Sequence, residues 1–490
     1  MSTANKRPFP LRAALALVAA LFLLTVALPA RASASQTAAV QAHLLWSRYD
    51  DAAVARQLDK VRDAGAGMVR VDLGWSSLEQ VGKGQYNPWY LGKIDNVVNQ
   101  AEARGIRVLF TFWETPCWAS TAPEDLKQSC TGAWWDRGVQ RYPPANPSDF
   151  GAALAYLARR YGRRVAAWEL WNEPNHPDYF KASDRVASYA ALGKAAYPAA
   201  KAADPGATII AGSLADADFD FTEALYGQGV KGSFDAWSVH PYSEDRSPLD
   251  PGIAGWTKKS FIAGVPAVRD TMLRHGDDKP LWLTEFGWST CNVRGLEAYR
   301  NCVDPAVQAD YLRLAYQQMR AFTYVPVGVW FNLQDTSSNL GSRVDNFGLV
   351  NYAGADTPAF TAFRTAALAM GAPSPPDTTP PETTRTGGPV GTVEVAASDS
   401  LLRVEVRGRA VRRAGSPRVK RIRVRIVLER RRPGRWVKVA RRSVRARAGG
   451  RFATAFDKMP AASYRVRLRP VGKARLRIVL DSGMPRVVRI

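Results

Sequence analysis

The chain has 490 residues, of which 46% are hydrophobic and 23% are charged, and its formal net charge is +23. That length suits one large domain with a smaller module. No segment after residue 28 is apolar enough to cross a bilayer, which excludes a polytopic membrane protein.

The N-terminal segment has the layout of a secretory signal peptide. Lys6, Arg7 and Arg12 precede an apolar run from Ala13 to Leu28, and small-residue cleavage sites follow. The apolar run has sixteen residues, fewer than the ~20 that a spanning helix needs, which favours a cleaved leader over a retained anchor. We therefore expect residues 1–34 to be a signal peptide and the mature protein to be secreted, extracellular or associated with the cell surface.

From residue 40 to residue 370, short β-rich segments alternate with amphipathic segments, which is typical of repeated βα units. Most of the β-rich segments are dominated by apolar residues, as expected for a parallel sheet covered on both faces. The eight candidate strands are His43 to Trp46, Met68 to Leu73, Ile106 to Phe112, Val165 to Trp171, Ala207 to Gly212, Ala236 to His240, Pro280 to Glu285 and Val327 to Asn332. Eight repeats favour a (β/α)8 barrel over residues 35–371. A doubly wound open sheet is the alternative, but no Gly-rich phosphate loop follows the first strand.

Two glutamates stand where predicted strands end. Asn172-Glu173-Pro174 follows the fourth predicted strand, and Glu285-Phe286-Gly287 ends the seventh. In such barrels the chemistry lies at the carboxyl ends of the strands. A pair of strand-end glutamates in a chain with 15 tryptophans indicates acid/base and nucleophile chemistry on a glycosidic bond.

These motifs resemble those of the retaining glycoside hydrolases of clan A, and His240-Pro241-Tyr242 after the sixth strand is a further match. The resemblance covers roughly residues 40–370 and is nearest to families 5 and 39. It implies that Glu173 is the acid/base and that Glu285 is the nucleophile. In a retaining mechanism the first must be protonated and the second ionised.

The resemblance also implies a set of substrate-binding residues. Asn172 would hold the sugar 2-hydroxyl, and His240 and Tyr242 would hold the nucleophile and the sugar in the subsite of the cleaved bond. Trp330, on the eighth predicted strand, would form an aromatic floor under the apolar face of the sugar ring.

Two further charged residues fall on the predicted strands. Arg70, near the end of the second strand, is expected to keep Glu285 ionised through its positive charge. Glu169 lies four residues before Glu173 and faces the same side of the strand, and we expect it in the barrel interior without a catalytic role. No serine nucleophile elbow and no phosphate-binding loop occurs. No cofactor is expected.

Four cysteines fit an exported protein. Cys117 and Cys130 are 13 residues apart, Cys291 and Cys302 are 11 apart, and each pair brackets a loop beyond a predicted strand. Three pairings are conceivable, of which two local disulfides are the simplest. Each would contribute ~3 kcal/mol in the chain-entropy account. A metal site is disfavoured because neither a C-x-x-C motif nor histidine partners accompany the cysteines, and no metal is expected.

The C-terminal part differs in composition from the rest. Residues 372–389 form a Pro/Thr-rich linker that cannot bury a core. Residues 401–490 hold 29 Lys and Arg against four Asp and Glu, a net charge of +25, so the remaining residues sum to −2. Arginines alternate with apolar residues at period two, as in Arg421 to Ile426 and Arg465 to Arg469. This pattern predicts a small all-β, sandwich-like basic domain over residues 390–490.

The charge of this domain suggests partners. A strongly basic surface would attract an anionic cell-wall polymer or a membrane surface. No nucleic acid partner is expected, since no aromatic-interleaved binding motif appears. The alternative is a solubilising β-module.

The sequence therefore predicts a secreted glycoside hydrolase that acts on a polysaccharide or oligosaccharide, with endo and exo action both open. The resemblance to clan A implies that it is a retaining enzyme. The alternative function is a non-catalytic carbohydrate-binding cell-wall protein on a barrel scaffold.

Overall fold

The computed structural model describes residues 36–252, 256–296 and 301–370, together with separate strands between residues 390 and 489. The chain divides into two compact units, Met1–Pro376 and Asp377–Ile490. The expected signal peptide and the expected linker lie outside the described residues. Within the described residues, no helix has the length and apolar character that a membrane crossing requires.

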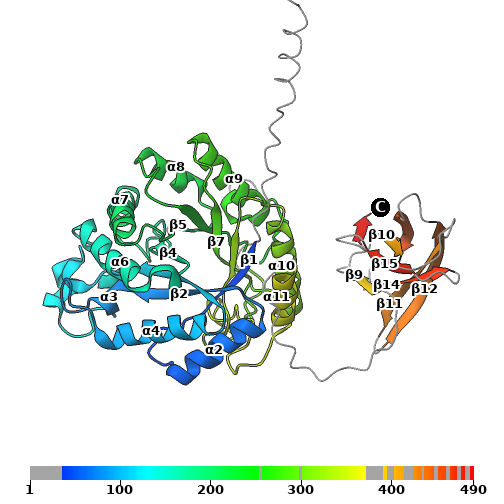
Figure 1. Cartoon of the computed structure of the whole chain (residues 1–490), viewed down its shortest axis with the longest axis horizontal. Coiled ribbons are helices and arrows are strands. Elements are labelled where there is room, and N and C mark those ends of the chain that lie inside the picture. Colours follow the sequence, from blue (N-terminus) through cyan, green and yellow to red (C-terminus); the bar gives the residue numbers. More distant parts are fainter. Residues whose placement is uncertain are drawn as a thin grey trace, which may run out of the picture. The chain divides into compact units, whose positions relative to one another are not determined.

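The first unit is a closed barrel of eight parallel strands in the order β1 to β8 (Figure 1). The (β/α)8 prediction is confirmed. The strands are β1 Thr37–Gln41, β2 Met68–Gly74, β3 Arg107–Trp113, β4 Ala167–Leu170, β5 Ile209–Ala215, β6 Ala236–His240, β7 Leu281–Phe286 and β8 Val327–Trp330. Seven of them overlap the predicted segments.

The prediction of the first strand was wrong. The segment from His43 to Trp46 is a loop, and β1 precedes it. The small residues of β1 fit the tight barrel closure, where Ala39 is opposite both Met68 of β2 and Val329 of β8. His43 consequently lies in the loop that follows a strand end, the place where barrel enzymes hold their functional groups.

Helices surround the barrel (Figure 1) and pack on it through one large apolar cluster. Asn146 accepts a hydrogen bond from the Ser148 amide at the start of one helix, and Pro147 opens it, as the sequence predicts. The longer helices are α2 Asp51–Asp63, α4 Pro88–Glu102, α6 Pro147–Tyr161, α7 Arg185–Ala203, α8 Phe219–Gly227, α9 Phe261–Arg274, α10 Pro305–Met319 and α11 Pro358–Ala369.

The barrel interior has an apolar part and a polar part. Ala39, Met68, Leu109, Ala167, Ile210, Ala236, Trp282, Val327 and Val329 form the apolar cluster. Two residues further along five of these strands, the fully buried side chains are polar or charged: Gln41, Arg70, Thr111, Glu169 and Ser238. This polar layer lies directly under the strand ends that carry the site.

Two disulfides close loops of the barrel unit. Cys117 pairs with Cys130 in the loop after β3, and Cys291 pairs with Cys302 in the loop after β7. Both predicted local pairings are confirmed.

The described part of the second unit consists of antiparallel strands in two sheets. The two predicted alternating segments fall on β11 and β14. One sheet has the order β12-β11-β14-β9, and the other has the order β13-β10-β15 with β16 paired to β10. The strands are β9 Val390–Val393, β10 Leu402–Arg412, β11 Arg423–Arg432, β12 Arg435–Arg445, β13 Arg451–Met459, β14 Tyr464–Val471, β15 Leu476–Leu480 and β16 Arg486–Arg489. The sandwich-like packing of these sheets stays a prediction.

Candidate active site

The two predicted glutamates lie at neighbouring places on the carboxyl side of the barrel. Glu285 belongs to β7 and is 8% exposed. Glu173 follows β4 in a turn where Trp171 (φ 67°) and Glu173 (φ 48°) both adopt left-handed backbone conformations. The Glu173 amide donates to the Ser213 carbonyl at 2.8 Å, which fixes this turn to β5. Strained backbone of this kind is typical of functional sites.

His240 lies between the two carboxylates. Its Nδ1 is 3.0 Å from Glu173 Oε1 and 3.8 Å from Glu285 Oε2, and its Nε2 is 3.3 Å from Ser213 Oγ. Burial alone would lower the pKa of His240, but the charges of Glu285 and Glu173 outweigh it, so the pKa is raised above the ordinary value of 6.5. The ring therefore carries its proton to higher pH than an ordinary histidine.

Glu285 is held by two donors. Arg70 Nη1 donates to Oε1 at 2.5 Å, and the Tyr242 hydroxyl donates to Oε2 at 2.8 Å. Burial, followed by the charge of Glu285, raises the pKa of Tyr242 well above its usual value, so the phenol keeps its proton. Both hydrogen bonds are donated to the carboxyl oxygens of Glu285, and a charged donor such as Arg70 makes the stronger contact.

Arg70 connects Glu285 to the polar layer below it. The guanidinium is fully buried and also donates to Glu169 Oε2 at 2.8 Å, to Gln41 Oε1 at 2.9 Å and to Asn172 Oδ1 at 3.0 Å. Burial would lower the pKa of Arg70, but Glu169 and Glu285 outweigh it and raise the pKa. The side chain is therefore a fixed cation beneath the site.

Glu169 is buried in the barrel interior, as predicted. It accepts from Arg70, from Thr111 Oγ1 at 2.8 Å and from Ser238 Oγ at 2.7 Å. Burial acts to raise the pKa of Glu169, yet Arg70 and His240 hold it below the usual value. Its charge is thus used to position Arg70.

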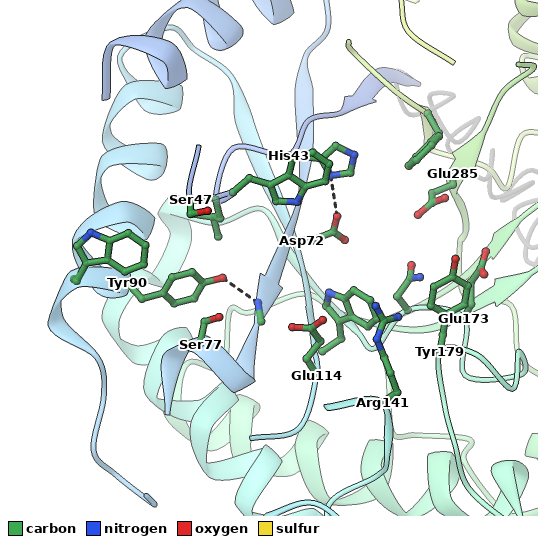
Figure 2. Close-up of a pocket in the computed structure, with 17 residues that line it drawn as sticks. His43, Ser47, Asp72, Ser77, Tyr90, Glu114, Arg141, Glu173, Tyr179 and Glu285 are labelled. Carbon is green, nitrogen blue, oxygen red and sulfur yellow. Dashed lines mark hydrogen bonds and ion pairs between the residues drawn. The ribbon is translucent and has the colours of Figure 1, made fainter. Parts of the chain in front are cut away.

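A cavity of about 620 Å³ opens beside the two glutamates (Figure 2). Figure 2 shows Asp72 and Glu114 facing the same space as Glu173 and Glu285. Asn172, Tyr179 and Phe331 line it near the glutamates. Its other lining residues include His43, Trp46, Gly74, Trp89, Tyr90, Trp113 and Arg141. Carboxylates, an amide and aromatic rings together suit a ligand with both hydroxyl groups and apolar faces.

A second cavity of about 380 Å³ shares Glu173, Tyr179, Glu285 and Phe331 with the first. The two glutamates therefore lie where two cavities meet, so a ligand at the glutamates has room on either side. The remaining lining residues of the smaller cavity are His176, Ala215, Asp216, Tyr242, Glu244, Lys259, Arg343, Val344 and Phe347.

The structure corrects the prediction for Trp330. Trp330 is fully buried, donates from Nε1 to the Phe347 carbonyl at 3.1 Å, and packs against Phe286 and Trp288 away from both cavities. Phe331 lines both cavities in its place. Successive side chains of a strand point to opposite faces, so an error of one residue exchanges core and site.

The other predicted site residues come together. Asn172, His240, Tyr242 and Arg70 each lie within hydrogen-bond distance of one of the two glutamates or of one another. Sequence reasoning missed Phe331, and it also missed the charged residues of the smaller cavity, because these stand in loops whose order in the sequence gives no sign of their convergence.

Glu173, His240 and Glu285 could also hold a cation. One ligand atom from each lies within 4.8 Å of the other two, and they form the one such group among the described residues. The same atoms are engaged with each other, with Arg70 and with Tyr242, an arrangement that equally serves proton transfer.

Comparisons with known proteins bear on the family and on the barrel fold. The model of the cellulase family, glycosyl hydrolase family 5, matches residues 29–324. No curated protein matches the chain. Among solved structures, a family 39 glycoside hydrolase from Bacteroides cellulosilyticus WH2 is 18% identical with a TM-score of 0.56, over 89% of this chain and 82% of that one. A family 39 β-xylosidase from Caulobacter crescentus is 17% identical with a TM-score of 0.51, over 89% and 96%. A variant of a family 5 enzyme from Streptomyces cattleya, in complex with Manβ1-4GlcNAc, is 15% identical with a TM-score of 0.51, over 71% and 82%.

Proposed function

Because the chain belongs to glycosyl hydrolase family 5, the cellulase family, we propose that it hydrolyses a β-linked poly- or oligosaccharide by double displacement, with retention of the anomeric configuration. Family and fold make the protein a glycoside hydrolase. The mechanism, the residue roles and the substrate are the content of the proposal.

In the first step Glu173 donates its proton to the glycosidic oxygen while the Glu285 carboxylate attacks the anomeric carbon. The bond to the leaving sugar breaks, and a covalent glycosyl–Glu285 ester forms. Arg70 and Tyr242 keep Glu285 ionised and aimed by their hydrogen bonds. Asn172, itself oriented by Arg70, is placed in the larger cavity to hold the sugar 2-hydroxyl.

In the second step Glu173 acts as a base. It removes a proton from water, whose oxygen attacks the anomeric carbon and releases Glu285 as a carboxylate. His240 contacts Glu173 and faces Glu285, so its cation stabilises negative charge as it moves between the two groups.

The observation that carries this proposal is the distance between the two carboxylates. An oxygen of Glu173 lies within 4.8 Å of an oxygen of Glu285. Retaining enzymes hold their carboxyl groups ~5 to 5.5 Å apart, whereas inverting enzymes hold them ~6.5 to 9.5 Å apart to leave room for water.

The cavities and the similar solved structures support a proposal for the substrate class. Hydroxyl-binding carboxylates beside aromatic rings suit an uncharged sugar chain. The neighbours include a β-xylosidase and an enzyme bound to Manβ1-4GlcNAc, so we propose a β-linked glycan of xylose, glucose or mannose type.

We also propose that the protein is exported, with residues 1–34 as signal peptide. The two disulfides support this, because such bonds persist in oxidising compartments. The basic C-terminal unit would then hold the enzyme on an anionic cell-wall polymer or membrane surface. Binding of the whole chain to polygalacturonate or phosphatidylglycerol vesicles should collapse as salt rises from low ionic strength to ~1 M, where the screening length falls to about 3 Å. Retention at the higher salt contradicts the electrostatic part.

A panel digestion tests the enzymatic proposal. β-Glucans, xylans, mannans, arabinans and acidic exopolysaccharides are incubated with the wild type and with Glu285→Gln. We expect product release from one polymer, lost in the variant. Release that survives the substitution contradicts the assignment of Glu285, and binding without cleavage by the wild type favours the non-catalytic carbohydrate-binding protein.

A further inference from the structure

The smaller cavity is lined by both charged and apolar side chains. Three loops, which follow β5, β6 and β8, bring Asp216, Glu244, Lys259 and Arg343 to its lining, and we call these residues the charged cluster. Phe331, Phe347 and Val344 supply apolar lining to the same space. The proposed mechanism uses none of the charged cluster, although the cavity contains both glutamates.

Ion pairs hold the charged cluster together. Lys259 Nζ lies 3.1 Å from Asp216 Oδ1 and 3.1 Å from Glu244 Oε1, and Arg343 pairs with Glu244. The two cations balance the two carboxylates, so the cluster as a whole is neutral. It presents both donors and acceptors, which is what a sugar hydroxyl needs, because each hydroxyl donates one hydrogen bond and accepts others.

Backbone geometry indicates that the two carboxylates are built into place. Asp216 has φ 58° and Glu244 has φ 56°, left-handed conformations that are uncommon for residues other than glycine. The Ala217 amide fixes the first loop by donating to the Lys258 carbonyl at 2.9 Å. Strained residues held by their surroundings concentrate at ligand-binding places.

The charged cluster is also electrically linked to the glutamates. Burial raises the pKa of Asp216 to about 6 against the opposing charge of Lys259, and Glu244 and Glu173 add to the rise. Groups that bind next to Asp216 therefore lie within the field of Glu173, in the cavity that Asn172 does not line.

We propose that the smaller cavity binds the leaving-group sugar, with Lys259 and its carboxylate partners as the hydroxyl-binding surface and Phe347 with Val344 as the apolar surface. This inference rests on the proposed function and names its substrate more closely. The leaving group is a neutral pyranose, so the natural substrate is at least a disaccharide. A uronic acid is disfavoured here, since both cations already have carboxylate partners.

The same cavity would receive acceptor sugars once the first product has left. An acceptor hydroxyl attacks the anomeric carbon of the glycosyl–Glu285 ester, the ester bond breaks, and a new glycosidic bond forms. Glu173 takes the hydroxyl proton, and Glu285 is released as a carboxylate. Water and the acceptor compete for one intermediate, so the ratio of transfer to hydrolysis reports acceptor binding independently of the overall rate.

The test measures that ratio. The full chain is given 2,4-dinitrophenyl β-glycosides of glucose, xylose and mannose, with cellobiose, xylobiose or mannobiose as acceptor, and both products are quantified. In Lys259→Met we expect the transfer-to-hydrolysis ratio to fall about tenfold, the order expected for losing hydrogen bonds to a charged group. Lys258→Met is the matched control: Lys258 is the preceding residue, pairs with Asp218 and Asp220, and lines neither cavity, so its ratio should equal that of the wild type.

A second variant covers the case in which Lys259→Met does not fold. Val344 is 70% exposed, so Val344→Asp should fold, and its added charge should lower the ratio for neutral acceptors. An unchanged ratio in either folded variant overturns the inference, as does a wild type that cleaves the aryl glycosides and transfers to none of the acceptors. Failure of the proposed function looks different, because the wild type then releases no dinitrophenolate, or releases as much as Glu285→Gln.

Discussion

Arg70 performs two separable tasks in this barrel, and a double substitution distinguishes them. Its guanidinium neutralises Glu169, which is fully buried, and donates to Glu285 in the site. In Arg70→Met the charge of Glu169 stays buried without its cation. Breaking a buried ion pair on one side costs about 3–5 kcal/mol of unfolding free energy.

Removing both members of the pair has a different consequence. Replacing a buried pair by apolar residues of similar volume is often neutral, so Arg70→Met/Glu169→Leu should recover at least ~2 kcal/mol of the loss, even though Thr111 and Ser238 lose an acceptor. Activity should not recover. Glu285 still lacks a charge-assisted hydrogen bond of about 1.5–3 kcal/mol, which lowers kcat/KM about 10- to 150-fold in both variants.

Urea unfolding followed by tryptophan fluorescence measures the free energy of unfolding of each variant. Of the 15 tryptophans, all but Trp436 precede residue 377 and therefore report on the barrel unit. Hydrolysis of an aryl β-glycoside measures kcat/KM. The reasoning is refuted if the double variant is no more stable than Arg70→Met, or if it regains wild-type activity.

The ion pair between Arg70 and Glu169 also predicts how stability depends on pH. Because the pKa of Glu169 is depressed in the folded protein, its contribution to stability is present above the unfolded value of about 4.3 and is lost as pH falls below it. The wild type should therefore lose more stability than the double variant on acidification below about pH 4. Equal losses would contradict the ion-pair account.

Three further predictions concern the site. Glu173→Ala should hydrolyse glycosides with poor leaving groups at least ~100-fold more slowly. Added azide should restore the turnover of activated glycosides, and the product should be a β-glycosyl azide, which NMR detects. An α-glycosyl azide as the product would contradict the roles given to the two glutamates. His240→Asn should lose the most stability relative to the wild type at acidic pH. The pKa of His240 is raised in the folded protein, so its contribution to stability is fully present below ~6.5 and is lost as pH rises through the higher folded value. Urea unfolding from pH 5 to 9 measures this, and the opposite trend with pH would contradict it. Phe331→Ala should raise KM with little loss of stability, whereas Trp330→Ala should lower the free energy of unfolding by about 3–5 kcal/mol. Urea unfolding and aryl-glycoside kinetics measure both effects. The reverse pattern would indicate that Trp330, and not Phe331, binds the substrate.

Much of the barrel could be predicted because its signals are local. Seven strands stand out as apolar runs, and the two glutamates follow directly from where β4 and β7 end. The first strand was misplaced because Thr37–Gln41 is rich in alanine, whereas the loop behind it contains Leu44, Leu45 and Trp46. The apolar character of that loop comes from packing beside the site and not from sheet formation.

Site residues that belong to a sequence motif could be predicted, whereas residues that only the folded chain brings together were missed. Asn172 and His240 stand beside strand ends, so their place follows from the topology. The choice between Trp330 and Phe331 depends on which face of β8 looks inward, and the sequence is strongly apolar on both sides of that position. Lys259 reaches the smaller cavity from just before α9, through ion pairs that no sequence pattern announces.

The most direct test of the central claim is covalent trapping of the nucleophile. The full chain is incubated with 2,4-dinitrophenyl 2-deoxy-2-fluoro β-glycosides of glucose, mannose and xylose, and its peptides are analysed by mass spectrometry. We expect one sugar ester on the peptide that contains Glu285, formed in step with dinitrophenolate release and absent from Glu285→Gln. An ester on any other carboxylate, or turnover with inversion and no ester at all, would contradict the double-displacement account.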